Sequence, residues 1–144
     1  MKVLIVSHVP GARTWMRSAL GPAWEAHEAS NGLEAVRLAS DEPFDLVIAD
    51  EWTEPFGAFG LTRELKILPE PPAVLIVLDR AQDVWLAGWS GADRWLLQPI
   101  DPFDLADAAL ELVAERGAGD GKSEDDLDLG GSTAASELTP APAE

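Results

Sequence analysis

Cysteine is absent from the 144-residue sequence, and only two histidines, His8 and His27, are present. A chain without thiols forms no disulfide and offers no thiolate metal site or cysteine nucleophile. Two histidines are too few for a histidine-rich zinc site. The first six residues hold five apolar residues around Lys2, which is too short for a signal peptide or a membrane span. We therefore expect a cytoplasmic protein without direct membrane insertion.

Basic residues are also scarce. Lys and Arg number 10 against 26 Asp and Glu, and the formal net charge is −16. Nucleic-acid binding and docking on anionic lipid both need clustered Lys and Arg, so the composition argues against both kinds of partner. The hydrophobic fraction of 47% is sufficient for a packed core, and the length suits one domain.

The carboxyl end differs in composition from the rest. Residues 117–144 carry seven acids and one base, Lys122, and contain no aromatic or β-branched aliphatic residue. Such a segment cannot bury enough apolar surface to offset its ordering entropy. We expect a globular domain over residues 1–116, followed by a disordered acidic tail over residues 117–144 that has no secondary structure.

Apolar runs alternate with helical patterns along residues 1–116. Runs that are apolar on both faces are typical of strands covered on both sides, and they occupy residues 3–6, 44–49, 73–78 and 95–97. Residues 24–29 are more polar and suit an edge strand. Helices are predicted over residues 12–20, 33–39, 59–68, 81–89 and 102–115. With right-handed crossovers, this order predicts a doubly wound α/β fold with a five-stranded parallel sheet.

Polar side chains follow four of the predicted strands, and ligands in such folds bind at the carboxyl ends of the strands. We expect these side chains to share one crevice, whatever the function of the protein. They are Ser7, His8, Asp50, Asp79 and Gln98.

Over residues 2–115 the sequence resembles the receiver domain of two-component response regulators. The resemblance is carried, in order, by residues 3–6 (VLIV) with Pro10 and Arg13, 28–35 (EASNGLEA), 44–50 (FDLVIAD), 91–93 (GAD) and 98–101 (QPID). It implies a flavodoxin-like sheet with strand order 2-1-3-4-5. It also implies a cis peptide bond between Gln98 and Pro99.

The resemblance implies a phosphoacceptor at Asp50, but the surrounding positions depart from the family pattern. Ser7 and His8 stand where two acids help to hold a magnesium ion. Asp79 replaces a Ser or Thr, and Gln98 replaces a Lys that pairs with the phosphoryl group. The loop after Asp50 is also one residue longer.

These replacements disfavour phosphoryl transfer. Magnesium prefers carboxylate and phosphate oxygens, and acyl phosphate formation needs metal and cationic stabilisation of charge. Gln98 carries no charge, and Asp79 would repel a phosphoryl group. We therefore predict a pseudo-receiver without a cofactor and without enzyme activity. A magnesium ion is expected only if the site accepts phosphoryl groups, and its oxygen ligands would then come from Asp79, Glu51 or Glu54.

Purely structural roles are also open for these residues. Asp50 is interpreted as a strand-end residue that caps the following turn, with a working phosphoacceptor as the alternative. Asp79 is interpreted as a cap for the helix that follows it. His8 is interpreted as a solvated loop residue, with a ligand or pH sensor as the alternative.

The six tryptophans suggest a partner surface. Trp85 and Trp89 are four residues apart and share a helix face. Leu86 and Trp89 occupy positions that are polar in the family, and Trp95 falls on its switch aromatic. Either these side chains fill the core, or Leu86, Trp89 and Trp95 form a partner-binding patch on the face of the fourth helix, fifth strand and fifth helix, where a homodimer is one form of binding.

The sequence thus predicts a stand-alone, atypical response regulator that signals by protein–protein interaction, independently of phosphorylation. Two alternatives stay open. One is a conventional phosphoacceptor that uses Asp50 in a phosphorelay. The other is an accessory subunit of a larger protein assembly.

Overall fold

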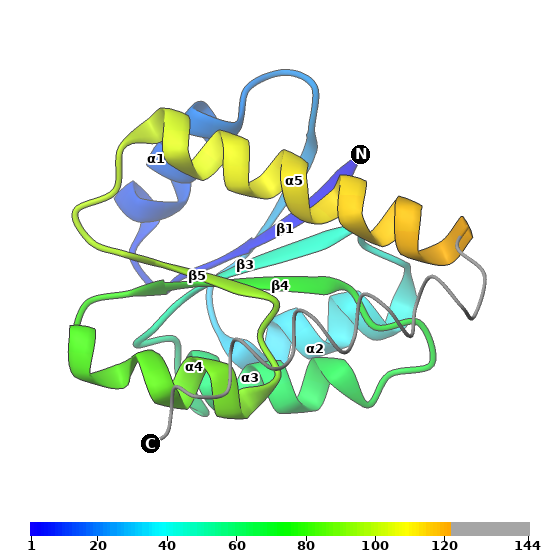
Figure 1. The fold of residues 1–144 in the computed structure, drawn as a ribbon. Helices are drawn as coiled ribbons and strands as arrows, with labels where there is room; N and C mark the ends of the chain where they lie inside the picture. Colours follow the sequence, from blue (N-terminus) through cyan, green and yellow to red (C-terminus); the bar gives the residue numbers. More distant parts are fainter. Residues whose placement is uncertain (122–144) are drawn as a thin grey trace. The chain divides into compact units, whose positions relative to one another are not determined.

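Five parallel strands form a sheet in the order β2-β1-β3-β4-β5, with helices on both faces (Figure 1). The computed structural model describes residues 1–121. The strands are β1 (Lys2–Val6), β2 (Glu25–Ala29), β3 (Leu46–Asp50), β4 (Ala73–Leu78) and β5 (Arg94–Leu97). The helices are α1 (Pro10–Leu20), α2 (Gly32–Asp41), α3 (Gly57–Lys66), α4 (Val84–Ser90) and α5 (Pro102–Gly121). The predicted α/β fold and strand order are confirmed in this part of the chain.

The central strands are buried on both faces. In β1, Val3 and Ile5 pack into one core cluster and Leu4 and Val6 into the other, and all four are fully buried. The first cluster adds residues of α1 and of α5 up to Leu112, and the second adds residues of α2, α3 and α4. This arrangement explains why β1, β3 and β4 are continuous apolar runs instead of alternating ones.

The register brings the carboxyl ends of the strands together. Val6 pairs with Ala29 of β2 and with Ala49 of β3, while Asp50 pairs with Val77 of β4. Residues that follow these strands therefore emerge at one edge of the sheet, where polar side chains no longer have to fit between two apolar layers.

Helix α2 begins with a reciprocal cap. The Asn31 side chain accepts a hydrogen bond from the backbone N–H of Glu34 at 2.8 Å, and the Glu34 carboxylate accepts one from the N–H of Ser30 at 2.9 Å. The first bond satisfies a donor that the first helical turn leaves free, and the second ties the residue before the cap to the helix. The start of this helix was predicted one residue later, at Leu33.

The fourth helix differs from its prediction. Residues 81–89 were expected to form one helix, but Ala81–Asp83 form a 3-10 turn and α4 begins at Val84. The N–H of Asp83 donates to the carbonyl of Arg80 at 3.0 Å, and the Arg80 guanidinium binds the Asp83 carboxylate over the same three-residue spacing. That spacing suits the tighter helix.

The last helix continues past the expected domain boundary at residue 116. Helix α5 continues to Gly121, so residues 117–121, expected to lack secondary structure, belong to it. No proline occurs between Pro102, at the start of α5, and Pro140, and a glycine disfavours a helix by only about 1 kcal/mol. The rest of the predicted disordered tail, residues 122–144, lies outside the described residues. None of the described helices is long and apolar enough to cross a membrane.

Two neighbouring glycines should respond to alanine with opposite signs. Gly88 lies inside α4, where an added Cβ would be 3.5 Å from the Trp95 ring, an ordinary van der Waals distance. Gly91 ends α4 with a φ of 96°, which disfavours any side chain. We predict that Gly88→Ala raises the free energy of unfolding by about 0.5–1 kcal/mol and that Gly91→Ala lowers it by about 1 kcal/mol. Urea unfolding measures both, and stabilisation by Gly91→Ala would contradict the left-handed helix end.

Candidate functional site

The crevice at the carboxyl edge of the sheet is built around Asp50, the last residue of β3. Its Oδ2 accepts a hydrogen bond from the hydroxyl of buried Ser7 at 3.1 Å. The Ser7 hydroxyl in turn accepts the N–H of Val9 at 3.1 Å, and the Ser7 carbonyl accepts a bond from Arg13 at 2.6 Å. Ser7 is therefore held in one position by both loop and helix, and it presents a neutral donor to Asp50.

Asp50 also organises the turn after β3. Its Oδ1 accepts the N–H of Trp52 at 3.3 Å, and its carbonyl accepts the N–H of Thr53 at 3.0 Å. These contacts agree with the predicted turn-capping role. His8, beside Ser7, is exposed, as expected for a solvated loop residue.

Gln98 lies at the far side of the crevice. Its backbone N–H donates to the carbonyl of Leu78 at 2.8 Å, and its peptide bond to Pro99 is cis, which confirms that prediction. A second cis bond, between Glu54 and Pro55, was not foreseen. The Gln98 side chain, together with Trp15 and Asp50, lines a cavity of about 40 Å³.

Asp79 does not cap the following helix, so that interpretation is wrong. Its carboxylate accepts a hydrogen bond from the indole N–H of Trp52, and the turn that follows begins after Arg80 without a side-chain cap. Asp79 is used differently because the exposed Trp52 side chain, on the loop after β3, extends across the crevice and donates its indole N–H to the Asp79 carboxylate. Sequence analysis had not assigned Trp52 any role.

Glu51 is a buried acid that sequence analysis treated only as an alternative metal ligand. Its Oε1 accepts the N–H of Asp79 at 2.7 Å, while its Oε2 has no hydrogen-bond partner. Burial, and secondly the facing Asp83 carboxyl, raise the pKa of Glu51 to about 6. A proton shared between Glu51 and Asp83 would satisfy the unpaired oxygen. The pKa of Asp83 is lowered, mainly by its hydrogen bonds with Arg80.

Together these contacts fasten the loop after β3 to the loop after β4. Glu51 and Trp52 on the first loop bind Asp79 on the second. The Arg80 guanidinium, bound to Asp83, also lies 5.7 Å from the centre of the Trp52 ring. Hydrogen bonds and a cation–π contact therefore link the two loops, and the ion pair with Asp83 holds the Arg80 guanidinium in place.

The residues around Asp50 do not fit a magnesium ion. The part of the chain described by the structure has no group of three or more acidic or histidine side chains placed to bind a metal. Asp50 is flanked by a serine hydroxyl that already binds it, and Glu51 is buried with one oxygen occupied. Magnesium prefers several carboxylate oxygens and water in an octahedral set, which these side chains do not supply.

The tryptophans of the predicted partner patch divide into two kinds. Trp85 and Trp89 of α4 are exposed by 65% and 60%. Trp95 is half-buried and packs against the core beneath Gly88, which agrees with the core-filling alternative, and Leu86 is half-buried. The Arg63 guanidinium of α3 lies 4.4 Å from the centre of the Trp89 ring. The exposed aromatic surface therefore lies between α4 and α3.

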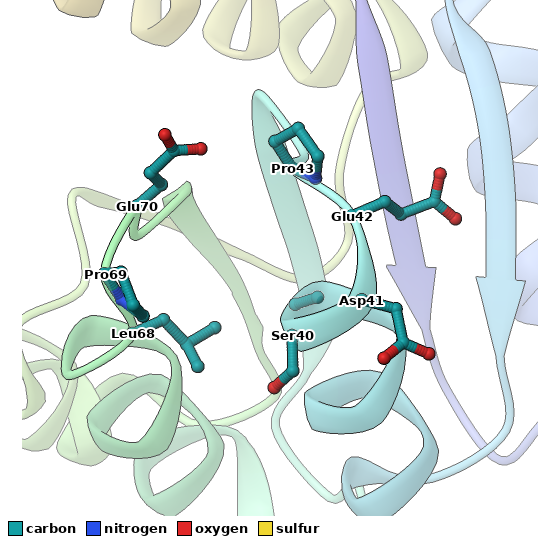
Figure 2. A pocket seen from close by; sticks show the side chains of 8 residues that line it. Ser40, Asp41, Glu42, Pro43, Leu68, Pro69 and Glu70 are labelled. Atoms are coloured by element: carbon teal, nitrogen blue, oxygen red, sulfur yellow. The ribbon is translucent and has the colours of Figure 1, made fainter.

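A larger cavity of about 450 Å³ lies between the α2–β3 and α3–β4 connections, at the amino ends of the strands (Figure 2). Its acidic side chains do not converge on a ligand. Figure 2 shows Asp41 and Glu42 pointing away from Leu68 and Pro69, and these acids pair with Arg37 and Lys2. Part of the cavity wall is apolar, and the acidic side chains are not arranged to bind a ligand inside it.

The fold defines a receiver domain. It is similar to a chemotaxis response regulator of Vibrio cholerae, with a TM-score of 0.72 and 22% identity over 77% of this chain and 97% of that one. It is also similar to a response regulator of Chloroflexus aurantiacus, with a TM-score of 0.75 and 19% identity over 78% of this chain and 97% of that one.

Sequence similarity gives the family. A response regulatory protein of Mycobacterium tuberculosis is 30% identical over 121 residues, which cover 78% of this chain and 91% of that protein. The chain therefore belongs to the response regulators and is a receiver of two-component signalling. No family model matches it.

The buried acid pair makes stability depend on pH. Since the pKa of Glu51 is raised from 4.5 to about 6, the folded protein binds this proton more tightly than the unfolded chain. The free energy of unfolding should therefore fall as pH rises from 4.5 to about 6. Glu51→Gln, neutral at every pH, should be more stable than the wild type at neutral pH by up to about 2 kcal/mol. The difference should disappear below pH 4.5.

Urea unfolding across this pH range measures both effects. Glu54→Gln, at an exposed position on the same loop, is the control and should stay within about 0.5 kcal/mol of the wild type. A Glu51→Gln variant that is less stable than the wild type at neutral pH would contradict the shared-proton interpretation.

Proposed function

We propose that this receiver signals by binding a protein partner, without the usual phosphorylation switch, and that it has no enzyme activity and no resident cofactor. The observation that carries the proposal is the environment of Asp50, whose carboxylate is bound by the neutral donors Ser7 and Trp52. None of the ion pairs within the described residues includes Asp50.

The chemistry of phosphoryl transfer supports the proposal. The transferring group carries negative charge, which metal ions and cationic side chains must stabilise. At this crevice Gln98 is neutral and Asp79 is an additional carboxylate. The fastened loops add a second argument, because Trp52 and Glu51 already hold Asp79 in place.

The proposed partner surface is the exposed aromatic face of α4. Trp85 and Trp89 project from one side of the helix, and Arg63 packs on the Trp89 ring. Tryptophan and arginine are the residues enriched at binding hot spots. The same surface would serve an accessory subunit of a larger assembly or a homodimer.

A conventional phosphoacceptor is the second candidate. It is favoured by the position of Asp50, half-buried at the end of β3 in a protein of the response regulator family. Under this alternative, a kinase and magnesium would have to act on Asp50 while its carboxylate accepts hydrogen bonds from Ser7 and Trp52.

The first test is chemical phosphorylation. Incubation with magnesium and acetyl phosphate should leave the intact mass unchanged, because the crevice lacks the charges that stabilise the transferring group. A mass increase of about 80 Da, the phosphoryl group, that Asp50→Asn abolishes would overturn the proposal in favour of the second candidate. A receiver that retains both acids after its first strand serves as the positive control.

The second test separates surface from core among the tryptophans. Trp89→Ala should lower the free energy of unfolding by no more than about 1 kcal/mol, since it removes an exposed ring and one cation–π contact. Trp24→Ala, at a buried ring, should cost about 3–5 kcal/mol. Equal losses would place Trp89 in the core and remove the α4 face as a partner surface.

A further inference from the structure

A narrow cavity lies directly beside Asp50. It has a volume of about 40 Å³, and its walls are Ala12, Trp15 and Met16 of α1, Val77 of β4, and Gln98. Asp50 is the one ionisable group in this lining. The space is large enough for water or a small ionic head group and too small for a nucleotide or a sugar.

No ion pair within the described fold includes Asp50. Its two oxygens accept from Ser7 and from the Trp52 N–H, which are neutral donors. The arginines on the adjoining elements already pair with other acids: Arg13, which also donates to the Ser7 carbonyl, binds Glu28, and Arg80 binds Asp83. A carboxylate in a partly desolvated cavity gains most from a cation that enters it.

The other walls also suit a cation. The Trp15 ring is 39% exposed, and an aromatic face attracts a positive group. The Gln98 side chain is exposed and offers an amide oxygen as an acceptor. The narrow space favours the compact ammonium of lysine over the broad, planar guanidinium of arginine.

We propose that this cavity binds the ammonium group of a lysine from a protein partner, between Asp50, Trp15 and Gln98. The inference rests on the proposed function, because a phosphoryl group on Asp50 would occupy the space that the ammonium group needs. Charge complementarity supports it: the chain has a net charge of −16, which favours basic partners, and Asp50 places one negative charge in the cavity wall.

The test uses n-butylammonium chloride as a lysine side-chain probe on the full chain at neutral pH. Backbone amide and indole NMR signals of Asp50, Trp15 and Gln98 should shift and saturate. Sodium chloride at the same ionic strength should not reproduce the shifts. Asp50→Asn should weaken the response at least about tenfold, and Glu70→Gln, which removes a charge at the opposite end of the strands, should leave it unchanged.

Gln98→Lys supplies the ammonium from within the chain. It should fill the cavity, pair with Asp50 and abolish the response to the probe while raising the melting temperature. Persistence of the shifts in Asp50→Asn, an equal effect of sodium chloride, or saturable binding of magnesium alone would each overturn the inference. Labelling by acetyl phosphate reports separately on the proposed function, so the failure of one is distinguished from the failure of the other.

Discussion

Burial of the central strands on both faces is the constraint on which the site depends. Val3 to Val6 in β1 are fully enclosed between the two core clusters, as are most residues of β3 and β4. Polar side chains cannot lie within such strands without losing their hydrogen bonds with water. They therefore collect where the strands end, and parallel pairing places those ends at one edge. Ser7, Asp50, Asp79 and Gln98 share a crevice for this reason.

Within that crevice the acids interact mainly with the protein itself. Asp79 receives the Trp52 indole and offers its own N–H to Glu51, whose second oxygen faces Asp83. The loops after β3 and β4 are the segments that a charged ligand at Asp50 would have to displace, and here each holds the other. We propose that the linked loops do not rearrange when a ligand binds. Instead, they keep the surface in one conformation, which a partner recognises.

The fold was predictable from sequence because burial leaves a strong periodic signal. The runs at 3–6 and 73–78 and the start of α2 are local features, and each was placed within a residue or two of its observed position. The 3-10 turn before α4 was not predictable, since it depends on the pairing of Arg80 with Asp83, whose i,i+3 spacing also suits an ordinary helix. The end of α5 was missed because glycine weakens a helix without ending it.

The positions of the site residues were predictable, and their partners were not. Sequence order and strand ends bring Asp50, Asp79 and Gln98 together. The role of Trp52 depends on the direction of an exposed side chain, which no periodicity reveals. The raised pKa of Glu51 depends on its burial against Asp83, and these residues are far apart in the sequence. The sequence shows only that Glu51 is an acid next to Asp50, and this pattern suggested a metal ligand instead of a buried acid with a raised pKa.

The most direct measurement is a backbone amide NMR titration with magnesium and beryllofluoride, a stable stand-in for a phosphoryl group on aspartate. The account predicts no saturable shifts for Asp50, Asp79 or the amides of α4, because the crevice lacks the charges that hold such a group. Saturable shifts that reach from Asp50 through Asp79 into α4, and that are lost in Asp50→Asn, would contradict it.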